Sequence, residues 1–89
     1  MDRKERIEAL LREALAPSAL AVVDDSARHA GHSGAAPGGG THYDVRIVAE
    51  RFAGLSRVAR HRLVNQALKA EFAAGLHALA IRAEAPGGA

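Results

Sequence analysis

The sequence predicts an α+β fold in which a three-stranded sheet is covered on one face by two helices. Two segments carry apolar residues at helical spacing, and three shorter segments are rich in apolar or alternating residues, in the order α-β-β-α-β. A sheet with one apolar face needs a covering layer, which two amphipathic helices can supply as a small α+β sandwich. The 89 residues suffice for one domain. We place it at 1–85, followed by a frayed tail at 86–89.

The first helix is expected over 2–15. Asp2, followed three residues later by Glu5, is typical of a helix start, and Pro17 disfavours helical geometry in the residue before it. The apolar stripe of this helix consists of Ile7, Leu10, Leu11, Ala14 and Leu15.

The first strand is expected over 20–23, where the sequence is short, apolar and partly β-branched. A long glycine-rich segment follows over 27–40, which predicts a mobile loop. The second strand is expected over 41–49, because Tyr43, Val45 and Ile47 alternate with polar residues at a period of two.

The second helix is expected over 56–73, with a turn at Gly54, a capping Ser56 and Gly75 placed to end it. The buried stripe of this second helix consists of Leu63, Val64, Ala67, Leu68 and Phe72.

The third strand is expected over 76–83.

The composition limits the kinds of binding site and partner that the chain can have. The chain has no cysteine, which excludes disulfides and zinc–thiolate sites, so metal ligation falls to His, Asp or Glu. A net charge of +2 is weak for a nucleic-acid binder. No apolar run approaches the roughly 20 residues of a membrane span, and the charged N-terminus does not resemble a signal peptide. We therefore expect a cytoplasmic protein with no membrane association.

Five histidines in so short a chain are unusual. His77 shares strand parity with Leu79, so a structural histidine at the core side of the strand edge is the simplest interpretation from the residues alone. His29 and His32 lie in the glycine-rich segment, where solvated side chains are the usual outcome, although a flexible loop can bring either ring towards His77. His42 reads as exposed and structural, at the exit of the loop.

Basic residues gather at the start of the second helix. A solvated helix turn is the simplest interpretation, and binding of phosphate or of an acidic partner is the functional one. The residues concerned are Arg57, Arg60, His61 and Arg62. Catalysis is not expected, because Ser33 is the only serine near a histidine and it lies in the glycine-rich segment.

Five short segments stand out in collinear order: HAGH at 29–32, GTHY at 40–43, FAGLS at 52–56, RHRLV at 60–64 and GLHAL at 75–79. Together they resemble the BolA family, and the match extends from the first helix to the third strand. Their combination is specific, although each segment alone is weak.

This resemblance implies a fold related to the type II KH domain and a protein without catalytic activity. It implies a monothiol glutaredoxin as partner and a [2Fe-2S] cluster shared with the glutaredoxin cysteine and glutathione, in iron–sulfur trafficking or iron sensing. The ligands it implies are His77, at the start of the last strand, and a loop residue, best matched by His32 and next by His29. The isolated protein is expected to be a monomer without cofactor.

The KH-like fold keeps a second function open, that of a DNA-binding regulator of stress or morphology genes acting through the basic second helix. KH domains clamp nucleotides with a GxxG loop between two helices. Here Gly31-His32-Ser33-Gly34 lies between two predicted strands, and aromatic residues for base stacking are few. DNA binding is therefore the alternative function, expected to be weak.

Overall fold

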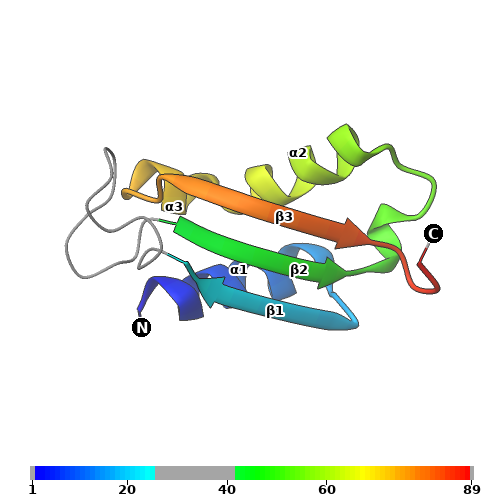
Figure 1. Cartoon of the computed structure of the whole chain (residues 1–89), viewed down its shortest axis with the longest axis horizontal. Helices are drawn as coiled ribbons and strands as arrows, with labels where there is room; N and C mark the ends of the chain where they lie inside the picture. The colour runs from blue at the N-terminus through cyan, green and yellow to red at the C-terminus, as the bar shows by residue number, and fades with distance from the viewer. Residues whose placement is uncertain (1, 26–41, 89) are drawn as a thin grey trace.

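The fold was analysed in a computed structural model that describes residues 2–25 and 42–88 (Figure 1). The predicted loop at 27–40, with His29 and His32, lies outside these residues. The elements are α1 (Arg3–Leu15), β1 (Ala19–Asp24), β2 (His42–Val48), the short 3-10 helix η2 (Glu50–Phe52), α2 (Arg57–Ala67), α3 (Lys69–Ala73) and β3 (Ala78–Glu84).

The three strands form one mixed sheet in the order β1-β2-β3. β1 and β2 are antiparallel, whereas β2 and β3 are parallel, so β1 ends where β2 and β3 begin. All described helices lie on one face of the sheet, where α1 contacts β1 and α2 contacts β3, and none of them covers the other, open face (Figure 1). The predicted α+β class is confirmed.

The core lies between the sheet and the helices. Tyr43, Val45 and Ile47 point into it from β2, as their alternation predicted, and Phe52 is fully buried. Burial of this apolar surface is the main stabilising contribution to folding. The helices contribute the buried residues Ile7, Leu11, Leu15, Val64 and Leu68.

The helix starts follow the predicted caps. The Asp2 side chain accepts a hydrogen bond of 2.9 Å from the backbone N–H of Glu5, and the Glu5 carboxylate accepts one from the backbone N–H of Asp2. The Ser56 hydroxyl accepts a bond of 3.1 Å from the backbone N–H of Ala59 at the start of α2. Such caps satisfy amide groups that have no partner within the helix.

The continuous helix predicted over 56–73 is wrong, because it is divided into α2 and α3 at Leu68. The backbone of Leu68 departs from helical geometry, with φ −101° and ψ 13°. Its side chain is fully buried in the core, so the break lies at a packed position. The change of direction presents Glu71 of α3 to Arg3 and Arg6 of α1, which the apolar stripe does not reveal.

Smaller differences concern the strand ends and the tail. β1 extends one residue further at each end than predicted, and β3 begins two residues later, at Ala78. The predicted tail includes a turn, in which the N–H of Gly88 donates to the carbonyl of Ala85 at 3.0 Å. Within the described residues no helix has the length and apolar character to cross a membrane.

Candidate functional site: two histidines at one end of the sheet

His77 lies directly before β3, at the end of the sheet where β2 also begins, and it is exposed. Its neighbour Ala78 pairs in register with His42, the first residue of β2. The two imidazole rings are therefore close, with centroids 5.6 Å apart and planes inclined by 33°. The core-side position expected for His77 is wrong, because the residue precedes the strand and its side chain reaches solvent.

The segment that leads to His77 is anchored on the helical layer. The backbone N–H of Leu76 donates to the carbonyl of Glu71 at 2.9 Å, and the Leu76 side chain is buried. Gly75 has φ +119°, and a Cβ there would lie 3.3 Å from Nη2 of Arg3. Glycine therefore suits both the backbone conformation and the guanidinium packed against it.

Glu71 holds α1 and α3 together beneath this segment. Its carboxylate is 5% exposed and accepts hydrogen bonds from Nε of Arg3 at 3.3 Å and from Nε of Arg6 at 3.1 Å. A buried carboxylate needs such partners, because an unpaired charge in the interior is costly. The segment that carries His77 is thus held by contacts within the helical layer.

His42 is held in place by a backbone hydrogen bond to Asp25 in addition to its pairing with β3. The N–H of Asp25 donates to the carbonyl of His42 at 2.8 Å, which joins the end of β1 to the start of β2. The exposed position expected for His42 is wrong, because the residue is half-buried and its ring faces His77. Beside it is a shallow hollow of about 240 Å³, lined by Asp25, His42, Tyr43, Ala78, Leu79 and Ala80.

Tyr43 borders this hollow from the core side. Burial raises the pKa of its hydroxyl above the usual value of 10.0, and the negative charge of Asp24 raises that pKa further. Asp24 is the register partner of Tyr43 on β1. Tyr43 is therefore a neutral hydrogen-bonding group at ordinary pH.

The pair offers two imidazole donors for a borderline metal such as iron. Among residues 2–25 and 42–88 there is no group of three His, Cys, Asp or Glu side chains that could hold a metal ion. Among the described residues the histidine pair is therefore not a complete metal site by itself. Sequence reasoning singled out His77 and missed His42, because the contact depends on the register of β2 and β3.

The basic residues predicted on the second helix are only partly brought together. Arg57, Arg60 and His61 line a hollow of about 580 Å³ between α2 and β3, whereas Arg62 is exposed outside it. Arg60 also has a structural role: Nε donates to the carbonyl of Leu55 at 3.0 Å, and Nη1 donates to that of Ala83 at 3.1 Å. Arg60 thereby fastens the start of α2 to the edge of β3.

Residues 11–87 match the BolA-like protein family. An uncharacterised protein of Sinorhizobium sp, from the 5' region of cobS, is 51% identical over 98% of this chain and 95% of its own length. BolA-like protein 1 of Mus musculus is 44% identical over 90% of this chain and 56% of its own length. The chain thus spans little more than half of that relative.

The fold is shared as well. The BolA domain of SufE1 from Arabidopsis thaliana has a TM-score of 0.89 and 43% identity, over 100% of this chain and 98% of that one. The corresponding full protein, SufE-like protein 1, is described as chloroplastic/mitochondrial, and this chain covers 24% of it. The expected cytoplasmic location stays a prediction. By sequence and by structure, this chain belongs to the BolA-like protein family.

Proposed function

We propose that this chain pairs with a monothiol glutaredoxin and co-ligates a [2Fe-2S] cluster through histidines, in iron–sulfur cluster trafficking or iron sensing. The BolA family is generally non-enzymatic. The proposed role is accordingly that of a binding module, which offers donors at its surface and carries out no covalent chemistry on a substrate.

The observation that carries this proposal is the placement of His77. It is exposed, its ring lies 5.6 Å from that of His42, and it stands at the end of the sheet where β1 finishes and β2 begins. The segment that carries His29 and His32 connects these two strands, so both of its attachment points are at this end. His42 and His77 therefore lie at the end of the sheet to which this connecting segment is attached.

His77 would hold the cluster from this chain, together with His32, or His29 in its place, from the connecting segment. His42 is a further candidate that the structure adds. Two donors suit a shared site, because a glutaredoxin cysteine and a glutathione thiolate would complete the coordination. A cluster with imidazole in place of thiolate on one iron has a higher reduction potential. The exposure of His77 leaves room for a partner to approach.

The test is reconstitution with a monothiol glutaredoxin, glutathione, iron and sulfide, followed by visible absorption and circular dichroism. His77→Ala should leave the fold intact, because the side chain is exposed, and should move the spectrum towards that of a glutaredoxin homodimer. His61→Ala is the matched control, since His61 lies on α2 outside the histidine pair. A His77→Ala complex with the wild-type spectrum would overturn the ligand assignment.

DNA binding is the second candidate function. The observation that favours it is the hollow lined by Arg57, Arg60 and His61, which concentrates positive charge between α2 and β3. Because Arg60 already donates to two backbone carbonyls, its contribution to a phosphate contact is limited. We expect such binding to be weak and to depend on salt.

A further inference from the structure

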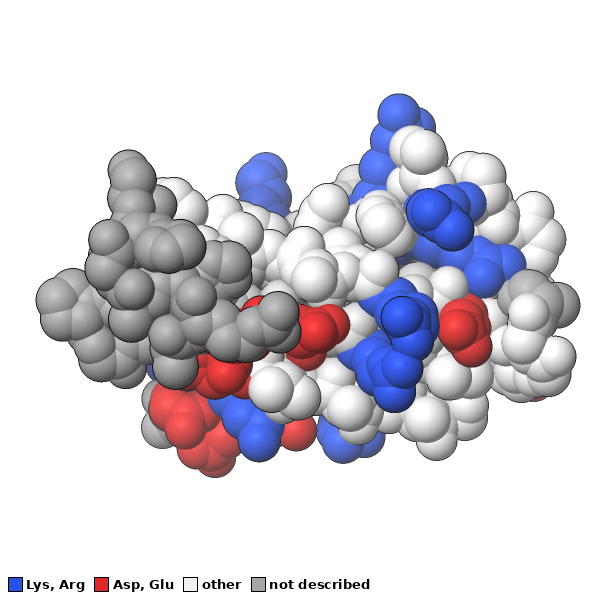
Figure 2. Space-filling model, in the orientation of Figure 1, with Lys and Arg blue, Asp and Glu red and all other residues white. Residues whose placement is uncertain are grey.

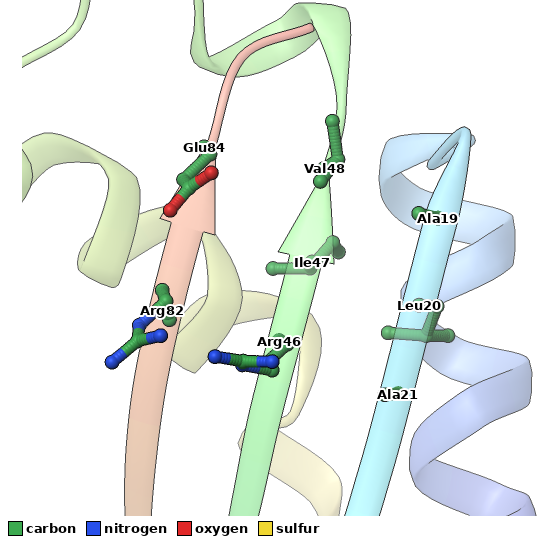
Figure 3. Close-up of a pocket in the computed structure, with 8 residues that line it drawn as sticks. All are labelled: Ala19, Leu20, Ala21, Arg46, Ile47, Val48, Arg82 and Glu84. Atoms are coloured by element: carbon green, nitrogen blue, oxygen red, sulfur yellow. The ribbon is translucent and has the colours of Figure 1, made fainter. Parts of the chain in front are cut away.

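Two arginines lie opposite each other on the open face of the sheet. Arg46 of β2 and Arg82 of β3 are register partners, and both are exposed. They project from neighbouring strands at the same level of the sheet (Figure 3). Like charges placed directly opposite on a sheet are destabilising, so this arrangement costs stability rather than contributing to it.

Neither guanidinium has a partner among the described residues that offsets this repulsion. The side chains of Arg46 and Arg82 form no hydrogen bond or ion pair within this part of the chain. Asp44 and Glu84 lie on the same face, two residues before Arg46 and two residues after Arg82, without bridging to them. The strand pair therefore presents two exposed guanidinium groups to solvent.

The surface around these arginines is hollowed, and the small side chains of Ala19 and Ala21 lie on its β1 side. A shallow depression of about 400 Å³ runs over this end of the sheet, lined by Ala19, Leu20, Ala21, Arg46, Ile47, Val48, Arg82 and Glu84. Arg82 and Glu84 also line the neighbouring hollow beside α2. Basic side chains accordingly gather over the middle of the sheet and again over the start of α2 (Figure 2).

We propose that Arg46 and Arg82 form the centre of a docking surface for an acidic segment of a partner protein. Two carboxylates of that segment would each face one guanidinium, which accepts carboxylate in a bidentate geometry. The backbone of the segment would pass over Ala19 and Ala21, where no large side chain obstructs it. Binding would relieve the repulsion that the register imposes on the two arginines.

The surroundings favour a protein segment over a nucleic acid. Asp44 and Glu84 flank the arginines and limit the positive surface to these two side chains, which matches two carboxylates but not a continuous phosphate backbone. No Phe or Tyr side chain among the described residues is exposed for stacking on bases, since Phe52 and Tyr43 are buried and Phe72 is half-buried. Leu55 is 37% exposed and lines the adjoining hollow, which offers an apolar contact suited to a protein.

This surface is separate from the histidine pair. Arg46 is four residues along β2 from His42, which corresponds to about 13 Å in a strand. An acidic segment over the arginines would therefore leave His77 accessible. The proposed docking surface does not depend on whether the chain binds a cluster.

The experiment uses the full chain and a fluorescein-labelled peptide in which Glu alternates with Ala, so that its carboxylates share one side when extended. We expect salt-sensitive binding in fluorescence anisotropy and none with the peptide that carries Gln in place of Glu. Each exposed pair contributes a factor of up to about five. The double variant Arg46→Glu/Arg82→Glu should therefore weaken binding by about tenfold or more.

The matched control is Lys4→Glu/Lys69→Glu, which makes the same charge change at exposed positions on α1 and α3, away from the open face. It should keep most of the binding. A peptide with Lys in place of Glu should in turn bind the Arg46→Glu/Arg82→Glu variant, which also shows that this variant is folded. Equal losses in both double variants would overturn the proposal. So would a single-stranded oligonucleotide that binds more tightly than the peptide and is lost on Arg46→Glu/Arg82→Glu.

Discussion

Nη2 of Arg3 donates a hydrogen bond of 2.8 Å to the carbonyl oxygen of Ala74, which ties the first turn of α1 to the end of α3. Nε of the same guanidinium pairs with Glu71, and its Nη2 lies beside Gly75. One side chain near the N-terminus therefore holds the chain three residues before His77. The accessible histidine stands on a rigid support rather than on a free turn.

Arg3→Ala should lower the free energy of unfolding by about 1–3 kcal/mol, because it removes charge-assisted hydrogen bonds and leaves the Glu71 carboxylate with Arg6 alone. Arg6→Ala should cost less, about 0–1 kcal/mol, since the Arg6 side chain is 40% exposed and its ion pair is screened by solvent. Urea unfolding measures both, with Lys4→Ala as the control at an exposed neighbouring position. Equal stabilities of Arg3→Ala and Lys4→Ala would show that the clamp does not stabilise the fold.

The identity of the second histidine donor is open to a direct comparison. We expect His32→Ala to alter the spectrum of the mixed complex more mildly than His77→Ala, because His29 lies three residues away and can substitute for it. His42→Ala tests the neighbour that the structure adds at 5.6 Å. If His42→Ala perturbs the spectrum as strongly as His77→Ala while His29→Ala/His32→Ala leaves it unchanged, the second donor is His42.

Tyr43 predicts a specific dependence of stability on alkaline pH. Burial, followed by the charge of Asp24, raises the pKa of its hydroxyl in the folded state above 10.0. The folded chain holds this proton more tightly than the unfolded chain does. The corresponding stability is fully present below the unfolded pKa and is lost as the pH rises through the raised folded value.

Tyr43→Phe removes this group while keeping the ring in the core. The free energy of unfolding of the wild type should therefore fall more steeply than that of Tyr43→Phe as the pH rises above about 10. Denaturant titrations at several pH values give the two curves, and their difference isolates this hydroxyl from other titrating groups. Parallel curves would show that the tyrosine has the same pKa in both states.

The triple variant Arg57→Ala/Arg60→Ala/Arg62→Ala tests DNA binding. It should abolish any binding of duplex DNA, because counterion release makes such contacts depend on these charges. Arg60→Ala must also be measured alone, since loss of its bonds to Leu55 and Ala83 should lower stability. Tight, sequence-selective binding that survives the triple change would make DNA recognition the primary function.

The layered architecture could be predicted from the sequence because it depends on local periodicity. The alternation of Tyr43, Val45 and Ile47 placed the core face of β2 correctly, and the caps at Asp2 and Ser56 marked two helix starts. The break at Leu68 could not be predicted in this way. No glycine or proline marks it, and it accompanies a tertiary contact of α3 with Arg3 and Arg6.

The candidate site was predictable to the same limited extent. The motif around His77 singled out one member of the histidine pair, but the contact with the other member depends on the pairing of His42 with Ala78. The opposition of Arg46 and Arg82 has the same origin. Both relationships join residues that are distant along the chain, and strand register between such segments leaves no local pattern in the sequence.

The parallel pairing of β2 and β3 also makes the histidine pair a product of long-range folding. Parallel neighbours require a crossover connection, and here η2, α2 and α3 form the connection that returns the chain so that Ala78 pairs with His42. A nascent or truncated chain without β3 lacks the pair altogether. Any ligand that requires both rings therefore recognises only the completed domain, and its binding energy opposes unfolding of the whole chain.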